Sequence, residues 1–236
     1  MCIRDSYLYD VENGVENDPK AWIVREGSRQ KNNEYSPVSY ADYPNPDAKD
    51  VTLHPTGAAP GIGQLGLSPG QGQETVIDNY SFGGTALAQA EWTEHRLMFA
   101  TKELTEPLHI SGTAKVTVRM SCDKPAANLS VWLVSLPWNS KSRRITDNVI
   151  TRGWADPQNR NSIRKSEPLV PGKFYNVTFA LQPDDQVIAK GQKIGLMIFS
   201  SDKDYTLWPK PGTKLTIDLA GTSLSLPVVG GAAAFK

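Results

Sequence analysis

The chain has 236 residues, of which 39% are hydrophobic, and its 25 basic and 25 acidic residues give a formal net charge of zero. A chain of this length can bury a substantial core in one large or two small domains. The balanced charge excludes a general electrostatic attraction to nucleic acid or to an anionic membrane. The 19 glycines and 17 prolines predict a turn-rich chain with few long helices.

The first residues do not resemble the start of a folded element. Residues 1–6 lack the apolar segment of a secretory signal peptide, and we interpret them as a translated sequencing-adapter remnant. The segment Tyr7–Val11 begins abruptly, so we expect the natural protein to continue upstream. The alternative is a genuine start with a frayed tail.

The N-terminal third alternates short apolar runs with segments rich in proline and glycine. Ala21–Arg25 and Val51–Leu53 favour short strands. Between them Gly27–Asp50 is polar, and its prolines disfavour both a helix and a central strand. Gly57–Gly72 holds six glycines and two prolines, which predicts a long loop.

From Arg96 onward, apolar residues recur at every second position, which is the period of a strand. The runs with this character are Val116–Met120, Tyr175–Leu181, Ile194–Ile198, Leu215–Leu219 and Leu224–Val228. Leu129–Leu136 is apolar on both faces, as in an inner strand. Turn pairs such as Pro171-Gly172 and Pro211-Gly212 separate them. Seven or more strands at this spacing predict an all-β fold, a jelly-roll β-sandwich of the galactose-binding-like kind with long loops and little helix.

Two signatures of catalytic proteins overlap within the glycine-rich segment, and we reject both on physical grounds. Gly61–Gly66 matches the dinucleotide fingerprint G-x-G-x-x-G, but the Pro- and Gly-rich residues after it cannot form the helix whose N-terminus would hold a pyrophosphate. Gly66–Gly70 matches the nucleophile elbow G-x-S-x-G around Ser68. The residue after Ser68 is Pro69, which has no N–H to contribute to an oxyanion hole.

The remaining candidates for chemistry are few. We interpret His54 as a loop residue before a proline, His95 as part of a polar run and His109 as the flank of an apolar strand, and we favour a structural role for each. Cys2 and Cys122 cannot form a disulfide framework or a multi-thiolate metal site. We therefore expect no catalytic, cofactor-binding or metal-binding residue, and no cofactor, in these 236 residues.

Aromatic and basic residues allow a carbohydrate-binding alternative. Trp132, Trp138, Trp154 and Trp208 could form a sugar-stacking platform, or they could pack the core and its ends. An exposed row of these rings would favour carbohydrate binding, and buried rings would favour the structural role. The cluster Lys141, Arg143 and Arg144 is more consistent with a solvated loop than with an anion site.

The C-terminal half resembles a known family. Pro171–Val177, Leu181–Pro183, Ile188–Leu196 and Ile198–Ser201 together resemble the C-terminal jelly-roll domain of Xaa-Pro dipeptidyl-peptidases and of the related cocaine-esterase-like acyl hydrolases. Upstream, Tyr7–Val15 resembles the last helix of that family's α/β-hydrolase domain. The segment Asn13–Asn17 favours the secreted actinobacterial-type peptidases over the esterases.

This resemblance implies a division of the chain and a function for the longer protein. Residues 7–17 would end a truncated α/β-hydrolase domain, residues 18–230 would form the jelly-roll domain, and residues 231–236 would be a disordered tail. A Ser-His-Asp triad upstream of Tyr7 would release N-terminal dipeptides ending in proline. This chain would pack on the catalytic domain and shape its cleft, for peptide substrates with proline at the second position.

Other implications of the resemblance stay open. A secreted or extracellular bacterial location is implied, although no signal segment is present. The alternatives are a cocaine-esterase-like acyl esterase as the longer protein, or a stand-alone carbohydrate-binding jelly roll. A complete small serine hydrolase would need Ser68 within hydrogen-bond reach of a histidine.

Overall fold

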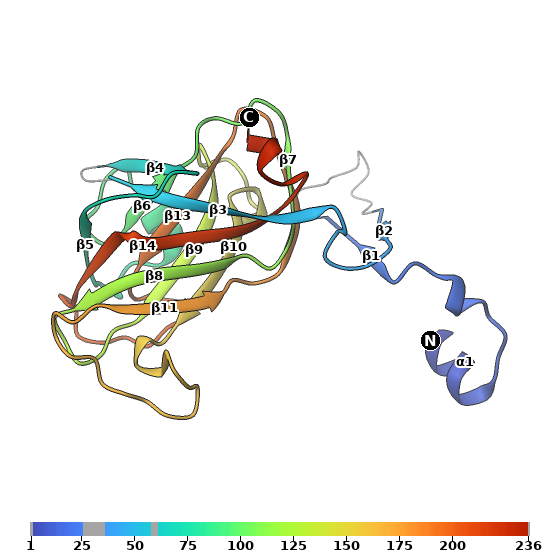
Figure 1. The fold of residues 1–236 in the computed structure, drawn as a ribbon, viewed down its shortest axis with the longest axis horizontal. Coiled ribbons are helices and arrows are strands. Elements are labelled where there is room, and N and C mark those ends of the chain that lie inside the picture. The colour runs from blue at the N-terminus through green and yellow to red at the C-terminus, as the bar shows by residue number, and fades with distance from the viewer. Residues whose placement is uncertain (1, 26–35, 58–60, 236) are drawn as a thin grey trace.

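The structure is a computed structural model that describes residues 2–25, 36–57 and 61–235 (Figure 1). Its helices are α1 (Cys2–Tyr9) and α2 (Gly84–Gln89), and its 3-10 turns are η1 (Val15–Asn17), η2 (Ile145–Asp147), η3 (Pro157–Asn159) and η4 (Gly231–Phe235). Its strands are β1 (Ala21–Ile23), β2 (Val38–Tyr40), β3 (Ala48–Thr56), β4 (Ile62–Gly66), β5 (Gln73–Ile77), β6 (Leu97–Ala100), β7 (Leu108–Gly112), β8 (Lys115–Cys122), β9 (Leu129–Leu136), β10 (Val149–Ala155), β11 (Tyr175–Ala180), β12 (Asp184–Ile188), β13 (Lys193–Phe199) and β14 (Lys214–Val229).

Twelve of these strands form one mixed sheet that curls nearly into a barrel, as expected for a jelly-roll-like β domain (Figure 1). One half has the order β10-β9-β13-β6-β4, in which only the β4–β6 pair is parallel. The other half is built around β14, which pairs with β3, β5, β7 and β8. β3 joins the halves, because residues 48–53 pair with β14 while residues 54–56 pair with β4.

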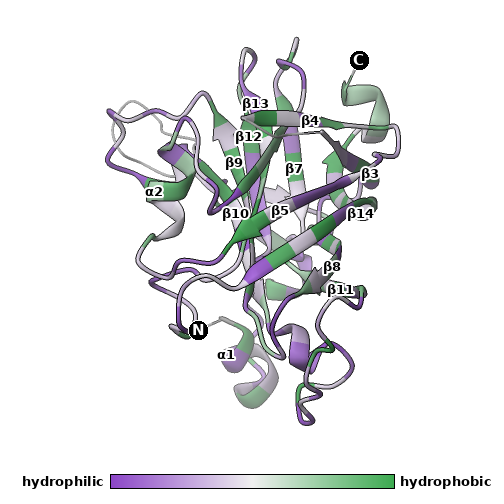
Figure 2. Ribbon diagram, turned by 90° about the vertical axis from the view of Figure 1, so that its left-hand side faces the viewer, coloured by the Kyte–Doolittle hydropathy of each residue, from purple (hydrophilic) through white to green (hydrophobic). Residues whose placement is uncertain are grey.

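The core has two layers, one inside the curled sheet and one outside it. Inside, Leu129, Leu133 and Leu196 pack with inward residues of the β14 half. Outside, Trp132 and Phe199, from the opposite faces of β9 and β13, pack against Leu87 of α2 and neighbouring apolar residues. β9 is therefore buried along its whole length, as its apolar residues on both faces predict. Figure 2 shows hydrophobic residues recurring along the strands of the sheet.

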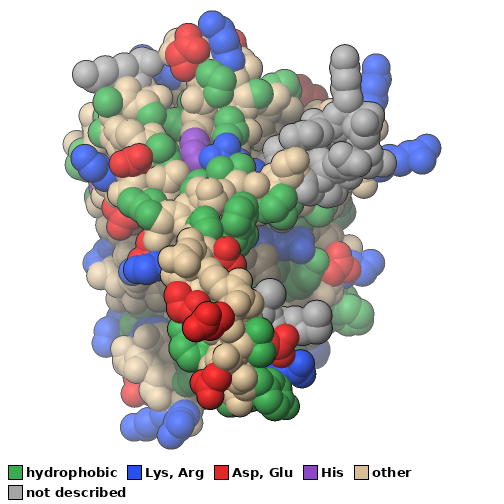
Figure 3. All heavy atoms as spheres, turned by 90° about the vertical axis from the view of Figure 1, so that its right-hand side faces the viewer, with side chains coloured by type: hydrophobic (Ala, Val, Ile, Leu, Met, Phe, Trp, Pro, Cys, Tyr) green, Lys and Arg blue, Asp and Glu red, His purple; other side chains and the backbone are tan. Residues whose placement is uncertain are grey.

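The N-terminal residues project from the barrel as an arm that ends in α1 (Figure 1). β1 and β2 pair only with each other and form a hairpin at the base of this arm. Viewed from the side of the arm, apolar and acidic side chains lie next to one another on its surface (Figure 3). Among the described residues, no helix has the length and apolar character needed to span a bilayer.

Three sequence-based expectations need correction. The predicted loop Gly57–Gly72 contains strand β4 at Ile62–Gly66. His54, expected in a loop before a proline, lies within strand β3. The C-terminal residues expected to be a disordered tail form the 3-10 turn η4 over Gly231–Phe235, and Phe235 packs against the core.

The glycines of β4 predicted a loop, but at least one of them is present because β4 packs closely against its neighbours. A Cβ on Gly63 would lie 2.5 Å from the carbonyl oxygen of Thr56 and 2.8 Å from the ring of Phe99. Gly63 is thus a strand residue that allows backbones to approach closely, and not a turn residue.

We predict that Gly63→Ala lowers the free energy of unfolding by about 1–3 kcal/mol, because the added methyl group must displace backbone atoms. Gly66→Ala is the matched control, because a Cβ at Gly66 would meet no atom within 4 Å. Urea denaturation of the two variants measures the difference. Equal losses for both would show that β4 does not pack as described.

Candidate functional site

The two glycine signatures adopt geometries that differ from those of working sites. Gly61–Gly66 leads into and forms β4, and the chain then passes through a bend at Leu67 and Ser68 toward strand β5. A phosphate site would need a helix to begin at the motif, because a helix N-terminus binds the phosphate. Here the motif forms a strand, and the next element is also a strand. Ser68 is exposed and makes no hydrogen bond to a described histidine.

The three histidines lie in different parts of the barrel. His54 is half-buried in β3, and its Nδ1 has no hydrogen-bond partner among the described residues. His95 Nδ1 lies 2.9 Å from the carbonyl oxygen of Ile77, and its ring stacks on Phe82. Only His109 lies beside a carboxylate, that of Asp185.

Asp185 is the centre of a buried polar cluster, the Asp185 cluster, which also contains Arg25, Tyr40, His109 and Ser111. Its side chain is only 4% exposed, and its Oδ1 atom lies 2.9 Å from His109 Nε2 and 3.4 Å from Arg25 Nε. The hydroxyl group of Tyr40 donates to the same oxygen at 3.2 Å. Arg25 in turn donates to that hydroxyl oxygen from Nη2 at 2.9 Å.

The Asp185 cluster joins the hairpin at the base of the arm to the barrel. Tyr40 belongs to β2 and Arg25 follows β1, whereas His109 lies on β7 and Asp185 on β12. In the β7–β12 pair, Asp185 lies opposite Ser111, two residues after His109. Two further hydrogen bonds support the junction: the Tyr43 hydroxyl donates to the Asp184 carbonyl, and the Asn45 N–H donates to Ser111 Oγ.

The electrostatics of the cluster favour an ionised Asp185. Burial by itself raises the pKa of Asp185, but hydrogen bonds from His109, Ser111 and Tyr40, with the charge of His109, outweigh burial and hold that pKa below its ordinary value. A carboxylate that accepts several hydrogen bonds is stabilised in its charged form.

A hydrolytic triad contains a histidine paired with a carboxylate, as His109 is with Asp185. It also needs a nucleophile that gives its proton to the histidine. Among the described residues, the one hydroxyl within hydrogen-bond distance of His109 is that of Tyr40, at 3.4 Å from Nε2. That hydroxyl already donates to Asp185 and accepts from Arg25. The geometry therefore supports fixing the hairpin in place and not nucleophilic catalysis.

Cys122 and the predicted basic cluster have local structural partners. Burial raises the pKa of the Cys122 thiol, which disfavours the reactive thiolate. Arg144 pairs with Asp147 at 2.6 Å, while Lys141 and Arg143 are exposed. The side chain of Cys2 lies outside the described part of the molecule.

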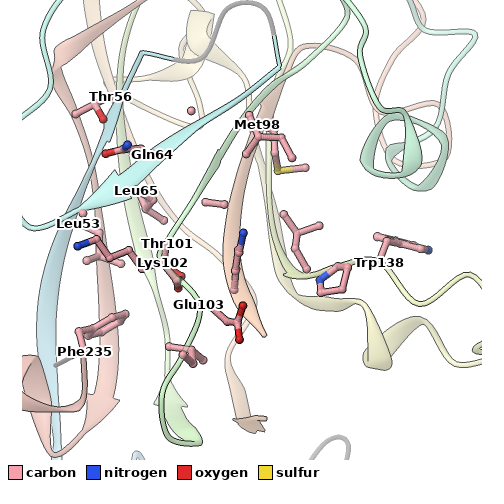
Figure 4. A pocket seen from close by; sticks show the side chains of 18 of the residues that line it. Leu53, Thr56, Gln64, Leu65, Met98, Thr101, Lys102, Glu103, Trp138 and Phe235 are labelled. Carbon is pink, nitrogen blue, oxygen red and sulfur yellow. Dashed lines mark hydrogen bonds between the residues drawn. The ribbon is translucent and has the colours of Figure 1, made fainter. Parts of the chain in front are cut away.

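A hollow of about 1150 Å³ opens beside β4 (Figure 4). Leu53, Leu65, Met98 and Trp138 provide much of its apolar lining, and Lys102 and Glu103 are charged residues on its wall. Ser68 also lines it, but none of the described lining residues is a histidine. The hollow can bind apolar groups, but its described lining residues include no histidine that could activate Ser68 as in a serine-hydrolase triad.

The four tryptophans do not form one exposed row. Trp132 is 2% exposed, Trp138 and Trp154 are half-buried, and Trp208 is 61% exposed. This distribution favours the structural role over a planar sugar-stacking platform.

Sequence reasoning missed the Asp185 cluster. Asp184–Gln186 reads as a polar turn after Pro183, yet β12 carries all three side chains into buried positions. The sequence carries one weak signal for the cluster. Two adjacent carboxylates precede Val187-Ile188, a pattern that is compatible with a strand whose carboxylates are buried against basic residues. The partners lie 76 and 145 residues away in the sequence, so only the fold brings them together.

Comparison with known proteins gives one consistent match. The family model described as "X-Pro dipeptidyl-peptidase C-terminal non-catalytic domain" matches residues 13–233. A protein of Rhodopirellula baltica named "Putative Xaa-Pro dipeptidyl-peptidase" is 62% identical over 228 residues, which cover 95% of this chain and 36% of that protein. This chain thus spans little more than a third of that relative's length.

Solved structures show the same fold at low sequence identity. An aminopeptidase from a marine sediment archaeon, Thaumarchaeota archaeon, aligns with a TM-score of 0.73 and 16% identity over 96% of this chain and 43% of that one. A CocE/NonD family hydrolase from Staphylococcus aureus aligns with a TM-score of 0.69 and 13% identity over 97% of this chain and 44% of that one.

We predict that Asp185→Asn lowers the free energy of unfolding by about 2–4 kcal/mol, because it leaves the half-buried Arg25 and His109 without their buried anionic partner. The control is Asp42→Asn. Asp42 forms an ion pair with the exposed Lys20 at 3.6 Å, and exposed pairs contribute less than about 1 kcal/mol. The asparagine oxygen can still accept from the N–H of Tyr43, as the carboxylate does. Urea denaturation measures both variants. A loss no larger than that of the control would contradict the structural role of the cluster.

The direction of the Asp185 pKa shift predicts a pH dependence. Because the pKa is lower in the folded than in the unfolded chain, the ionised carboxylate stabilises the fold fully above about pH 4. That stabilisation is lost as the pH falls through the lower folded-state pKa. We expect the stability difference between the unmodified chain and Asp185→Asn to shrink as the pH falls below about 4. Denaturation curves across that range measure it, and a difference independent of pH would refute the assignment.

Proposed function

The chain belongs to the family of X-Pro dipeptidyl-peptidase C-terminal non-catalytic domains, and from this we propose that it is the supporting domain of a longer serine peptidase. The longer protein releases N-terminal dipeptides that end in proline, using a Ser-His-Asp triad encoded upstream of Tyr7. The observation that carries the proposal is the family match over residues 13–233, in a chain that spans 36% of its Rhodopirellula relative.

We propose that the arm belongs structurally to the catalytic domain. Tyr7, Leu8 and Tyr9 on α1 are each about two-thirds exposed, an unusual state for three consecutive apolar side chains of a helix. These side chains would be buried if a catalytic domain packed around α1. The exposure supports Tyr7–Tyr9 as part of the catalytic domain. The division that we propose is residues 1–6 as an adapter remnant, residues 7–17 as the end of the catalytic domain and residues 18–230 as the jelly-roll domain.

The catalytic domain would also cover the face of the barrel around β4. Ile62 and Leu67, at the two ends of this segment, are more than half exposed beside the hollow. Burying such apolar area stabilises an interface by about 25 cal/mol for each Å² removed from water. A crevice between two domains is also a usual place for a ligand pocket, so this face would form one wall of the substrate cleft.

An acyl esterase of the cocaine-esterase-like group is the second candidate for the longer protein. The fold similarity to a CocE/NonD family hydrolase supports this candidate and the peptidase equally, because the two share the domain architecture. Carbohydrate binding has less support, since Trp132 is buried and Trp138 and Trp154 are half-buried.

The activity test compares this chain with the longer protein that contains it. We expect the longer protein to hydrolyse Gly-Pro-p-nitroanilide and to be inactivated by a fluorophosphonate that modifies its serine, and this chain alone to do neither. Hydrolysis of a phenyl ester but not of the anilide would favour the esterase. Hydrolysis of the anilide by this chain alone, at an enzymatic rate, would refute the proposal.

The exposed apolar surfaces give a second test on the isolated chain. We expect the chain to bind a hydrophobic dye such as ANS while folded, and a variant lacking residues 2–17 to bind less, because it lacks the apolar side chains of α1. Fluorescence titration at matched concentrations measures both. An intact, folded chain that does not bind the dye would contradict the proposed interface.

A further inference from the structure

An aromatic surface that the proposed function does not use lies where the β5–β6 and β13–β14 connections meet. We name it the aromatic patch and define it by Tyr80, Phe82, Trp154, Tyr205 and Trp208. Trp208 is 61% exposed, Tyr205 and Phe82 are also exposed, and Tyr80 and Trp154 are half-buried. Leu207, between the two exposed rings of the second loop, is 82% exposed.

The rings of the patch are held in stacked pairs. Trp208 stacks on Tyr80 with 5.6 Å between ring centroids and 11° between planes, and Tyr205 stacks on Trp154 at 4.6 Å. The guanidinium group of Arg152 lies 4.5 Å from the ring centre of Tyr205. Trp208 and Tyr205 thus pack on rings of their own domain and still remain 61% and 49% exposed.

Two buried carboxylates fix the loops that carry these rings. Asp202 is fully buried and accepts hydrogen bonds from the indole N–H groups of Trp132 and Trp154 and from the N–H of Gly84. Asp78 accepts from both the backbone N–H and the hydroxyl of Ser201. The patch is therefore preorganised, and a partner would lose little conformational entropy in binding it.

The indole N–H groups of the patch are already used within the domain, and this favours an apolar partner over a sugar. The indole N–H of Trp154 donates to Asp202, and that of Trp208 donates to the carbonyl oxygen of Lys203. The amide of Asn128 donates to Ser201 Oγ and to the carbonyl oxygen of Leu207. Sugar hydroxyls would need free directional partners, whereas an apolar protein surface needs only ring faces and aliphatic groups.

The patch is connected to the face that the proposed function assigns to the interface. Helix α2 links them: its first residue, Gly84, bonds to Asp202, while Ala88 and Gln89 near its end line the hollow. The Rhodopirellula relative has nearly two-thirds of its length outside the match, which is enough chain for a partner of this size. Aromatic side chains, which are enriched in the buried centres of protein interfaces, also suit a permanent interface within one polypeptide.

We infer that the aromatic patch is a docking surface for the upstream catalytic part of the same polypeptide, with Trp208 and Tyr205 as its central contacts. This inference rests on the proposed function, which supplies the upstream catalytic part. It adds the aromatic patch as a surface that this part contacts. The interface then continues from the hollow beside β4, across α2, to the β13–β14 connection.

Hydroxyl-radical footprinting with mass spectrometry tests the inference. We expect labelling of Tyr205, Leu207 and Trp208 to fall on the order of tenfold in the longer protein relative to this chain alone, because the interface excludes water. Equal labelling in both would overturn the inference. So would protection within the isolated chain that increases with its concentration, which would identify a second copy as the occupant, or protection by cellohexaose, which would identify a carbohydrate.

A pair of variants separates docking from a structural role of the ring. Trp208→Ala should lower the melting temperature of the longer protein more than that of this chain alone, while the control Ile163→Ala, at a 92% exposed residue outside the patch, should change neither. An equal decrease for Trp208→Ala in both proteins would show that the ring acts only within its own domain, which would overturn the inference. Protection of the patch in a longer protein without peptidase activity would refute the proposed chemistry and leave the docking surface standing.

Discussion

The curled sheet depends on the pairing of β14, which is hydrogen-bonded to four other strands along its 16 residues. Its first half pairs with β5 and β8 and its second half with β3 and β8, with a register shift between Asp218 and Ser223. The shift changes the strand's direction, as bulges do in curved sheets. Because inward residues such as Leu215 and Leu224 are fully buried on both sides of the shift, one strand supplies core to the whole β14 half of the barrel.

Buried carboxylates hold the segments that lie outside this core, namely the hairpin at the base of the arm and the loops of the aromatic patch. The Asp185 cluster fixes the hairpin at the base of the arm, and Asp78 with Asp202 fixes the loops that carry the aromatic patch. A buried charge is tolerated only when it is paired or hydrogen-bonded, so each carboxylate orients the segments that supply its donors. The barrel thus presents rigid attachment points, which suits a domain whose role in the family is non-catalytic.

The two glycine signatures show why a motif needs its structural context. Gly61–Gly66 has the spacing of a nucleotide-binding turn, but Gly63 is required because β4 lies too close to Thr56 and Phe99 for a side chain. Ser68 lies in an exposed bend before Pro69 and lines a hollow whose described residues include no histidine. The glycines of this segment therefore serve close packing. The catalytic residues that we propose for the longer protein lie in its upstream part.

The sequence alone determined the all-β class and most strands, because period-two alternation in segments such as Tyr175–Leu181 and Leu215–Leu219 records which face is buried. It also determined the family, because Pro171–Ser201 carries turn and strand residues in a recognisable order. Only the tertiary structure decided that Gly57–Gly72 contains a strand, that residues 231–235 pack as a turn, and that Asp185 meets Tyr40 and His109. Those features depend on contacts between segments far apart in the chain, and local residue patterns carry no record of which distant backbone or donor a residue will meet.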